Sequence, residues 1–398
     1  MGLNETPSSN RVHIGIFGKR NAGKSSVMNA LTNQSIAIVS DVLGTTTDPV
    51  LKAMELLPIG PVVMIDTPGI DDEGELGALR VRKSYQMLNK TDIAVAVIDG
   101  AEESAEDTAL IERIRKKNIP CAIFHNKSDT LPENFPRKEG HYYGSALTRD
   151  GIDELKEAIV KLAQVSEPDK KIVGDLLAPT DIAVLVVPID AAAPKGRLIL
   201  PQQQTIRDIL EAGGISVVVK ETELAETLKK LGTKPKLVIT DSQAFGKVSA
   251  VTPEDILLTS FSILFARYKG TLETAVRGAK ALDDIKDGDK ILISEGCTHH
   301  RQCGDIGTVK LPNWVKKHTG KDAAFEFTSG TEFPDDLSGY AAVIHCGGCM
   351  LNEREMKYRY ACAEEQGVPI TNYGIAIAHM HGILKRSVEP FEEIRKIL

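Results

Sequence analysis

Two groups of residues have the types and spacing needed for chemistry, and the first predicts a phosphate-binding loop. Gly18-Lys19-Arg20-Asn21-Ala22-Gly23-Lys24-Ser25 fits the pattern of such a loop and stands between a strand-like apolar run and a helix-like run. Its glycines let backbone N–H groups face the phosphates, its second lysine reaches the β- and γ-phosphate oxygens, and its serine hydroxyl binds Mg²⁺. The residues expected to bind nucleotide here are Gly18, Asn21, Ala22, Gly23, Lys24, Ser25 and Ser26.

Two later motifs predict that the nucleotide is GTP. Asp66-Thr67-Pro68-Gly69 ends an apolar run, which would put Asp66 in the Mg²⁺ shell and the Gly69 amide beside the γ-phosphate. Asn126-Lys127-Ser128-Asp129 ends another apolar run, and the Asp129 carboxylate can accept hydrogen bonds from guanine N1 and N2, a donor pair that adenine lacks. The residues expected around the base are Asn126, Lys127, Asp129, Ser145 and Ala146.

The second group consists of cysteines and histidines in the last third of the chain. Cys297-Thr298-His299-His300 follows one apolar run and His345-Cys346-Gly347-Gly348-Cys349 ends another, so both would lie at the carboxyl ends of parallel strands. Without a secretory signal, this clustering favours a metal site over disulfides. Cys346 and Cys349 could bind one centre, and Cys297 would complete a set of three thiolates. Zinc and an iron–sulfur cluster fit about equally well, and a redox-active dithiol is a third reading.

A [4Fe–4S] cluster at this position would need a fourth ligand, because three thiolates account for three of its irons. The candidates besides water are His299, His345, Asp305 and Cys303. Cys121 and Cys362 are interpreted as structural residues, in a core strand and a helix respectively. His379 and His381 are two residues apart on a predicted helix and are interpreted as surface residues.

Composition predicts a globular chain of two or three domains. The 398 residues are 42% hydrophobic and 26% charged, and a net charge of −7 does not favour a nucleic-acid partner. The longest apolar stretches, such as 182–189, are shorter than the roughly 20 residues that cross a bilayer. We therefore expect a cytoplasmic protein without a membrane segment.

The pattern along the chain predicts an α/β fold with three domains, each a mostly parallel sheet with flanking helices. Short β-branched runs alternate with amphipathic stretches throughout. A polar segment at 166–171 suggests the first boundary, and an apolar, helix-like stretch at 256–268 lies near the second. The expected domains are a GTP-binding domain at 1–168, a second domain at 172–265 and a metal-binding domain at 266–398.

The N-terminal motifs resemble those of the GTPases related to the tRNA-modification enzyme MnmE and the ribosome-assembly GTPase Era. Gly44-Thr45-Thr46-Thr47-Asp48 matches their switch I sequence Gly-Thr-Thr-Arg-Asp, with Thr47 replacing the arginine. The resemblance makes Thr46 a second Mg²⁺ ligand. Ile70 stands where Ras-like proteins carry glutamine, and the resemblance implies that K⁺ bound at Asn21 supplies the charge of an arginine finger. The expected catalytic residues are Lys24, Thr46, Asp66 and Gly69.

The whole chain resembles the [FeFe]-hydrogenase maturation GTPases of the HydF family, which combine such a G domain with Cys-x-His and His-Cys-x-x-Cys motifs. The resemblance implies a [4Fe–4S] cluster on Cys297, Cys346 and Cys349 and a homodimer formed by the middle domain. It also implies a scaffold that carries a transient diiron precursor, with two radical-SAM maturases and apo-hydrogenase as partners. The alternative is a tRNA- or ribosome-acting GTPase with a structural zinc site.

Overall fold

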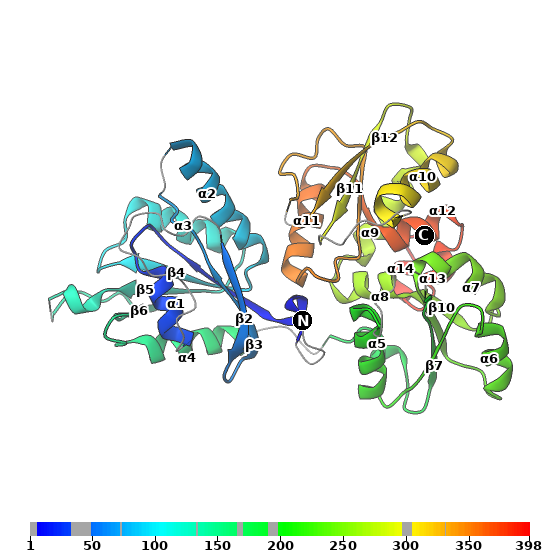
Figure 1. The fold of residues 1–398 in the computed structure, drawn as a ribbon, viewed down its shortest axis with the longest axis horizontal. Coiled ribbons are helices and arrows are strands. Elements are labelled where there is room, and N and C mark those ends of the chain that lie inside the picture. The colour runs from blue at the N-terminus through cyan, green and yellow to red at the C-terminus, as the bar shows by residue number, and fades with distance from the viewer. Residues whose placement is uncertain are drawn as a thin grey trace. The chain divides into compact units, whose positions relative to one another are not determined.

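The computed structural model describes residues 6–32, 49–71, 74–132, 134–164, 170–189, 198–296, 305–330 and 332–398. The chain divides into two compact units, Met1–Pro168 and Asp169–Leu398, each of which is described by itself (Figure 1). All three sheets are parallel or mostly parallel with flanking helices, which confirms the predicted fold class. In the described parts of the chain, no helix is long and apolar enough to cross a membrane.

The first unit is a six-stranded sheet in the order β2-β3-β1-β4-β5-β6, in which only β2 is antiparallel to its neighbour. The strands are β1 (Val12–Phe17), β2 (Val50–Leu56), β3 (Gly60–Asp66), β4 (Ile93–Asp99), β5 (Cys121–Asn126) and β6 (His141–Tyr143). The central strands β1, β3, β4 and β5 coincide with short β-branched runs of the sequence. They are buried on both faces, as parallel strands between helices must be.

Helices cover both faces of this sheet. The helices are α1 (Lys24–Thr32), α2 (Gly74–Met87), α3 (Ala105–Lys116) and α4 (Ile152–Gln164), with short 3₁₀ segments η1 (Ser8–Asn10), η2 (Leu88–Lys90) and η3 (Ser128–Thr130). Residues of α1 and α4 share one hydrophobic cluster with the strands, and residues of α2 and α3 share the other. Cys121 is packed against that second cluster, and burial raises the pKa of its thiol to about 11, in agreement with a structural role.

The second unit contains two four-stranded parallel sheets, ordered β10-β9-β7-β8 and β12-β11-β13-β14. The strands are β7 (Ile182–Val186), β8 (Ile215–Val219), β9 (Leu237–Thr240), β10 (Leu257–Ser260), β11 (Lys290–Glu295), β12 (Ala324–Ser329), β13 (Ala342–His345) and β14 (Ile370–Asn372). One hydrophobic cluster contains buried residues from both sheets. The expected boundary after residue 265 falls inside helix α8 (Phe261–Tyr268), which contributes to that shared core.

The remaining elements of this unit are helical. They are η4 (Gly174–Leu176), α5 (Leu200–Glu211), α6 (Leu224–Lys230), η5 (Ser242–Ala244), α7 (Phe245–Val251), α9 (Leu272–Lys280), η6 (Ala281–Asp284), the π-helical η7 (Ile306–Lys310), α10 (Leu311–Thr319), α11 (Glu353–Glu365), α12 (Tyr373–Met380), α13 (Leu384–Ser387) and α14 (Glu392–Arg395). Cys362 lies within α11, the helix predicted for it.

The helix expected over residues 256–268 is wrong in its first part. Residues Leu257–Ser260 form strand β10, which pairs with β9 at the edge of the sheet, and only Phe261–Tyr268 are helical. A short apolar run fits a buried strand and a buried helix equally well, so hydrophobicity alone could not separate them. The change of structure occurs at Ser260, whose hydroxyl accepts a hydrogen bond from the Ile263 N–H at 3.3 Å and caps the helix.

Helix α9 packs directly on strand β14 through a glycine. A Cβ built at Gly278 would lie 2.0 Å from the carbonyl oxygen of Ile370 and 2.5 Å from its carbonyl carbon. Backbone atoms cannot move aside as a flexible side chain can. The contact therefore fixes β14 against α9, and β14 in turn pairs with β13, which carries one of the predicted metal motifs.

We predict that Gly278→Ala destabilises the chain, although alanine normally favours a helix by up to about 1 kcal/mol over glycine. Overpacking of the α9–β14 contact should cost about 1–3 kcal/mol in a urea denaturation experiment. Gly246→Ala is the matched control, because Gly246 is also helical, in α7, and its added Cβ would meet nothing within 4 Å. If the two variants are equally stable, the close packing at Gly278 is wrong.

Candidate functional site

The phosphate-binding loop connects β1 to α1 and needs glycine at two positions. Gly18 has a φ of +152°, and a Cβ there would lie 2.3 Å from the carbonyl oxygen of Val97. Gly23 has a φ of +86°, and its Cβ would lie 2.2 Å from Asn126 Nδ2. Asn21 is also left-handed, with a φ of 57°, and its side chain is exposed. A loop of left-handed residues and glycines ahead of a helix N-terminus is an arrangement that binds anions through its backbone N–H groups.

Asn126 connects the phosphate loop to the loop expected around the base. Its Nδ2 donates to the carbonyl oxygen of Ala22 at 2.8 Å, and its Oδ1 accepts from the Ala146 N–H at 2.9 Å. The side chain is only 3% exposed, so both contacts are shielded from water. Ser145 is buried beside it, and its hydroxyl accepts from the Leu147 N–H at 3.2 Å. Asn126 therefore sets the spacing between the two loops.

Ser25 and Asp66 lie together where Mg²⁺ is expected. The Ser25 hydroxyl donates to Asp66 Oδ2 at 2.6 Å, while buried Asp66 Oδ1 has no hydrogen-bond partner among the described residues. Burial raises the pKa of Asp66, against the opposing effects of the Ser25 hydrogen bond and the Lys24 charge. A hydroxyl and a carboxylate with an unused oxygen suit a hydrated Mg²⁺ ion. Thr46, the other expected Mg²⁺ ligand, lies outside the described residues.

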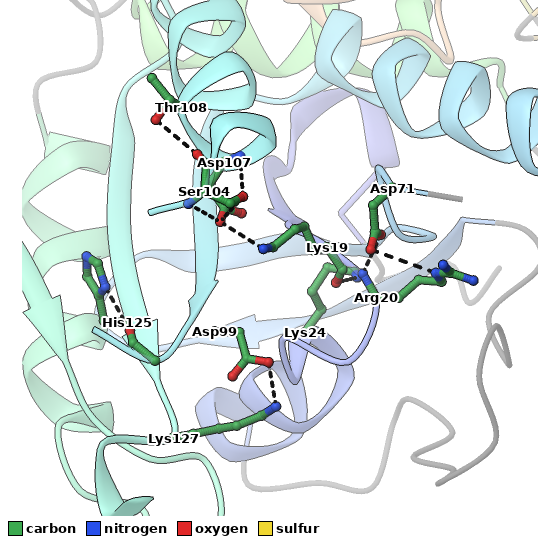
Figure 2. Close-up of polar contacts among 11 residues, drawn as sticks. Lys19, Arg20, Lys24, Asp71, Asp99, Ser104, Asp107, Thr108, His125 and Lys127 are labelled. Atoms are coloured by element: carbon green, nitrogen blue, oxygen red, sulfur yellow. Dashed lines mark hydrogen bonds and ion pairs between the residues drawn. The ribbon is translucent and has the colours of Figure 1, made fainter. Parts of the chain in front are cut away.

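Carboxylates from two neighbouring segments hold the phosphate loop in place (Figure 2). Asp71 accepts a hydrogen bond from the Arg20 N–H at 2.6 Å, and Asp107 forms an ion pair with Lys19 at 3.4 Å. Asp107 itself belongs to a capping box with Ser104 at the start of α3. Lys24 Nζ donates to the carbonyl oxygen of Lys19 at 2.7 Å. The Ser-x-x-Asp pattern at 104–107 signals the cap, but no sequence pattern predicts that the cap supports the loop.

The segment expected to select guanine follows β5. Lys127 has a φ of 63°, and its ammonium group donates to Asp99 Oδ2 at 2.8 Å. Asp129 lies on η3 and is exposed, as a base-binding carboxylate on a surface loop should be. Gly69, which follows β3, approaches Arg20 closely, since a Cβ there would lie 2.8 Å from the Arg20 nitrogen. Figure 2 shows the side chain of Lys127 pointing toward Asp99.

The second predicted metal motif lies at the carboxyl edge of the last sheet, next to the residue that precedes the first. Strands β11 and β13 are adjacent, with Ser294 opposite His345. The thiol sulfur of Cys346 accepts a hydrogen bond from the Gly296 N–H at 3.0 Å and another from the Gly348 N–H at 3.3 Å. Gly296 immediately precedes Cys297 in the sequence. Cys297, His299 and Cys303 themselves lie outside the described residues.

A buried lysine that the sequence analysis did not identify supports the Cys-x-x-Cys loop. Lys269 is 4% exposed, and its ammonium group donates to the carbonyl oxygens of Gly348 and Leu351. Burial lowers the pKa of Lys269 to about 8, against the attraction of Cys349 and Cys346. Burial also raises the pKa of Cys349, and the neighbouring Cys346 adds to that rise, while Lys269 opposes it. A metal cation bound to the two sulfurs would favour their thiolate forms.

Among the possible fourth ligands, His345 and Asp305 are described. His345 is fully buried, and its Nδ1 lies 2.7 Å from the carbonyl oxygen of Cys346. Its Nε2 lies 3.0 Å from the Arg359 guanidinium, which can only donate, so the proton of the neutral ring is on Nδ1. Both ring nitrogens of His345 are thus engaged within the chain. Asp305 caps η7 by accepting from the Thr308 N–H at 2.9 Å.

Family models match three parts of the chain. Residues 13–127 match the 50S ribosome-binding GTPase model, residues 172–270 match the hydrogen maturase F dimerization domain, and residues 273–390 match the hydrogen maturase F tetramerization domain. The two hydrogen maturase F models are consecutive and together account for the second unit of the structure. The GTPase model covers the phosphate loop, Asp66 and Asn126.

Two GTPases are similar in sequence to part of this chain. GTPase Era from Rippkaea orientalis is 30% identical over 234 residues, which cover 55% of this chain and 70% of the relative. The tRNA modification GTPase MnmE from Chromobacterium violaceum is 33% identical over 165 residues, which cover 40% of this chain and 36% of the relative. The chain therefore spans about a third of the length of that MnmE.

Solved structures give a weaker comparison. Era from Aquifex aeolicus bound to GDP·AlF4⁻ superposes with a TM-score of 0.35 at 20% identity, over 55% of this chain and 98% of that chain. The G domain of the T. maritima FeoB iron transporter gives a TM-score of 0.31 at 23% identity, over 39% of this chain and 100% of that chain. TM-scores this low do not establish a shared fold. The fold assignment follows instead from the strand order and the positions of the motifs.

The motifs, the strand order and the sequence matches define a P-loop GTPase of the class that includes Era and MnmE. The second unit narrows this class, because its two sheets match consecutive domain models of one family. The chain belongs to the hydrogen maturase F (HydF) family. This confirms the resemblance on which the sequence analysis relied.

We predict that Asp66→Asn raises the thermal midpoint of the nucleotide-free chain near neutral pH, because it removes a buried charge. The free-energy cost of that charge is fully present above the raised pKa of Asp66 and disappears as the pH falls through that pKa towards the ordinary value of 3.8. The difference between parent and variant should therefore shrink on acidification. The same variant should hydrolyse GTP at least about tenfold more slowly, because it weakens Mg²⁺ binding.

Asp129→Asn is the control for this experiment, because Asp129 is exposed and its charge carries no burial cost. It should leave the thermal midpoint unchanged while weakening the selection of guanine. If the Asp66→Asn variant has the same thermal midpoint as the parent chain at every pH, burial is not the cause of the raised pKa of Asp66.

Proposed function

We propose that this GTPase depends on Mg²⁺, is stimulated by K⁺, and acts as a scaffold and carrier for the diiron subcluster of [FeFe]-hydrogenase. We further propose that it holds a [4Fe–4S] cluster on Cys297, Cys346 and Cys349. The observation that carries the cluster proposal is the hydrogen bond from Gly296 N–H to Cys346 Sγ, because it brings the residue that precedes Cys297 next to Cys346 at one edge of a sheet.

The donor set fits an iron–sulfur cluster. Backbone N–H groups that donate to cysteine sulfur are a common feature of such sites and adjust their reduction potential. Cys346 accepts two of these bonds, and the left-handed Gly348, with a φ of 59°, allows the tight turn to Cys349. When bound, the cluster would supply an iron atom able to take an exchangeable ligand. The chain's own contribution is to hold the sulfurs, while Lys269 fixes the loop between them.

GTP hydrolysis would use the geometry around the phosphate loop. Backbone N–H groups and Lys24 would bind the β- and γ-phosphates, and Ser25 and Asp66 would hold Mg²⁺. Water attacks the γ-phosphorus and the bond to the bridging oxygen breaks, so negative charge develops on the departing GDP. Ile70 cannot orient water or offset that charge. The exposed amide of Asn21, in its left-handed turn, could hold a K⁺ ion beside the phosphates.

The chain would assemble as a homodimer through its middle domain, which is expected at 172–265. Strand β8 forms one edge of its sheet, and Ile215 and Val218 on that strand are 45% and 44% exposed. An apolar edge strand with unpaired backbone groups is well suited to pair with another chain. Two radical-SAM maturases and apo-hydrogenase remain the proposed partners. The alternative, a tRNA- or ribosome-acting GTPase with structural zinc, is supported by the match of residues 13–127 to the 50S ribosome-binding GTPase model and by relatives that match part of the chain.

We predict that K⁺ stimulates GTP hydrolysis at least about tenfold over Na⁺, because an ion at Asn21 would replace an arginine finger. Asn21→Ala should lose the stimulation by K⁺ while GDP binding, measured by calorimetry, stays within a factor of about three. Lys24→Ala should lose turnover in both salts. Equal rates in K⁺ and Na⁺ with the parent chain would contradict the proposal.

We predict that Cys297→Ser, Cys346→Ser and Cys349→Ser each lose the bound iron of anaerobically reconstituted protein. Cys303→Ser should retain it, as should Cys362→Ser, whose sulfur lies on α11 beside Gln366. Lys24→Ala should also retain iron, because nucleotide and cluster would bind to different units of the chain. Iron content and the EPR spectrum of the reduced protein report the outcome. Loss of iron from Cys362→Ser to the same extent as from Cys346→Ser would rule out the assigned ligands.

A further inference from the structure

Three side chains from separate elements of the second unit converge away from the proposed cluster ligands. Asp283 is on η6, His318 is in the last turn of α10, and His379 is in the last turn of α12. Helices α10 and α12 pack against each other (Figure 1). His379 and His381 are two residues apart on a predicted helix and were therefore interpreted as surface residues. The two partners of His379 are distant in sequence, and no motif connects the three.

Both imidazole rings direct Nε2 at the same carboxylate. His318 Nε2 lies 2.7 Å from Asp283 Oδ1, and His379 Nε2 lies 3.0 Å from Oδ1 and 3.1 Å from Oδ2. The ligand atoms of the three side chains all lie within 4.8 Å of one another. An ionised carboxylate can only accept, so each Nε2 carries a proton in this arrangement. When a metal ion binds, the ring proton would be on Nδ1 and the Nε2 lone pair would bind the ion.

From this geometry we propose that Asp283, His318 and His379 bind one divalent transition-metal ion, Zn²⁺ or Fe²⁺. Two imidazoles and one carboxylate are a common ligand set for both ions. Metal–ligand bonds of about 2.0–2.1 Å place tetrahedral ligand atoms about 3.3 Å apart. The observed contacts need to open by only a few tenths of an ångström to admit the ion.

The exposure of the three side chains suits an ion with an open coordination position. The side chain of Asp283 is 53% exposed, that of His318 is 26% exposed and that of His379 is 17% exposed. The carboxylate can therefore adjust its position, and water or an external ligand can reach the ion.

The chain contains a built-in reporter for this site. Trp314 is the single tryptophan, and it lies on α10 one helical turn before His318. Its ring meets the ring of His381 edge-on, with the ring centroids 6.2 Å apart. A paramagnetic ion at the three-residue site should quench its fluorescence.

The test is a titration of the full-length protein with Co²⁺, followed by Trp314 fluorescence. We expect saturable quenching with a stoichiometry of about one ion per chain. His318→Gln, His379→Gln and Asp283→Asn should each weaken the apparent affinity at least about tenfold, as loss of one ligand from a three-ligand site requires. His381→Gln is the matched control, because His381 follows the same helix and contacts Trp314 without facing Asp283. It should bind Co²⁺ as the parent does.

Competition identifies the ion. Zn²⁺, which is diamagnetic, should restore the fluorescence by displacing Co²⁺. Fe²⁺, which is itself paramagnetic, is compared under anaerobic conditions by the Co²⁺ that it releases, and the ion that displaces Co²⁺ at the lower concentration is the preferred one. Thermal unfolding without metal would show whether each variant is folded, and His318→Gln, the more exposed histidine change, provides a second test if His379→Gln is not. Non-saturable quenching, parental affinity in folded His318→Gln, or failure of both ions to displace Co²⁺ would overturn the proposal.

Discussion

Parallel strands end at the same edge of their sheet, and both candidate sites depend on this constraint. In the first unit, β1 ends just before Gly18, and β3 and β5 end at Asp66 and Asn126. The phosphate, magnesium and base segments therefore meet, although long stretches of sequence separate them. In the second unit, β11 and β13 bring Gly296 and Cys346 into hydrogen-bonding contact in the same way.

Hydrogen bonds of buried polar side chains stabilise the two edges, and burying the same groups without partners would cost free energy. Asn126 satisfies both ends of its amide between two loops, so each loop depends on the other for its position. Lys269 has a similar role at the second edge, where its ammonium group donates hydrogen bonds to two carbonyl oxygens of the Cys-x-x-Cys loop. Asp66 is different, because one buried oxygen has no partner in the described part of the chain. Such an unsatisfied group is expected where a ligand completes the structure.

Features that follow from local sequence patterns could be predicted from the sequence alone. The central strands are long apolar runs, and the nucleotide motifs have fixed spacing, so the fold class and the family could be predicted. Strands β2, β6 and β12 were not predicted, because β2 and β12 are largely exposed and β6 has only three residues. Strand β10 was taken for helix, because its four apolar and hydroxyl residues run directly into α8.

The supporting side chains could not be predicted for a different reason. Asp71 and Asp107 hold the phosphate loop, and Lys269 holds the cysteine loop, but their partners are fixed only by the folded backbone. The same is true of Asp283, which meets His318 and His379 from other elements. Sequence spacing reveals partners on one strand end or one helix face, whereas these contacts arise from packing between elements.

We propose above all that this HydF-family GTPase binds an iron–sulfur cluster at the edge formed by β11 and β13. The most direct test is quantification of iron, acid-labile sulfide and zinc per chain after anaerobic purification and reconstitution. The account predicts about four iron and four sulfide per chain, as one [4Fe–4S] cluster requires. Zinc bound at the cysteines, with neither iron nor sulfide, would contradict it.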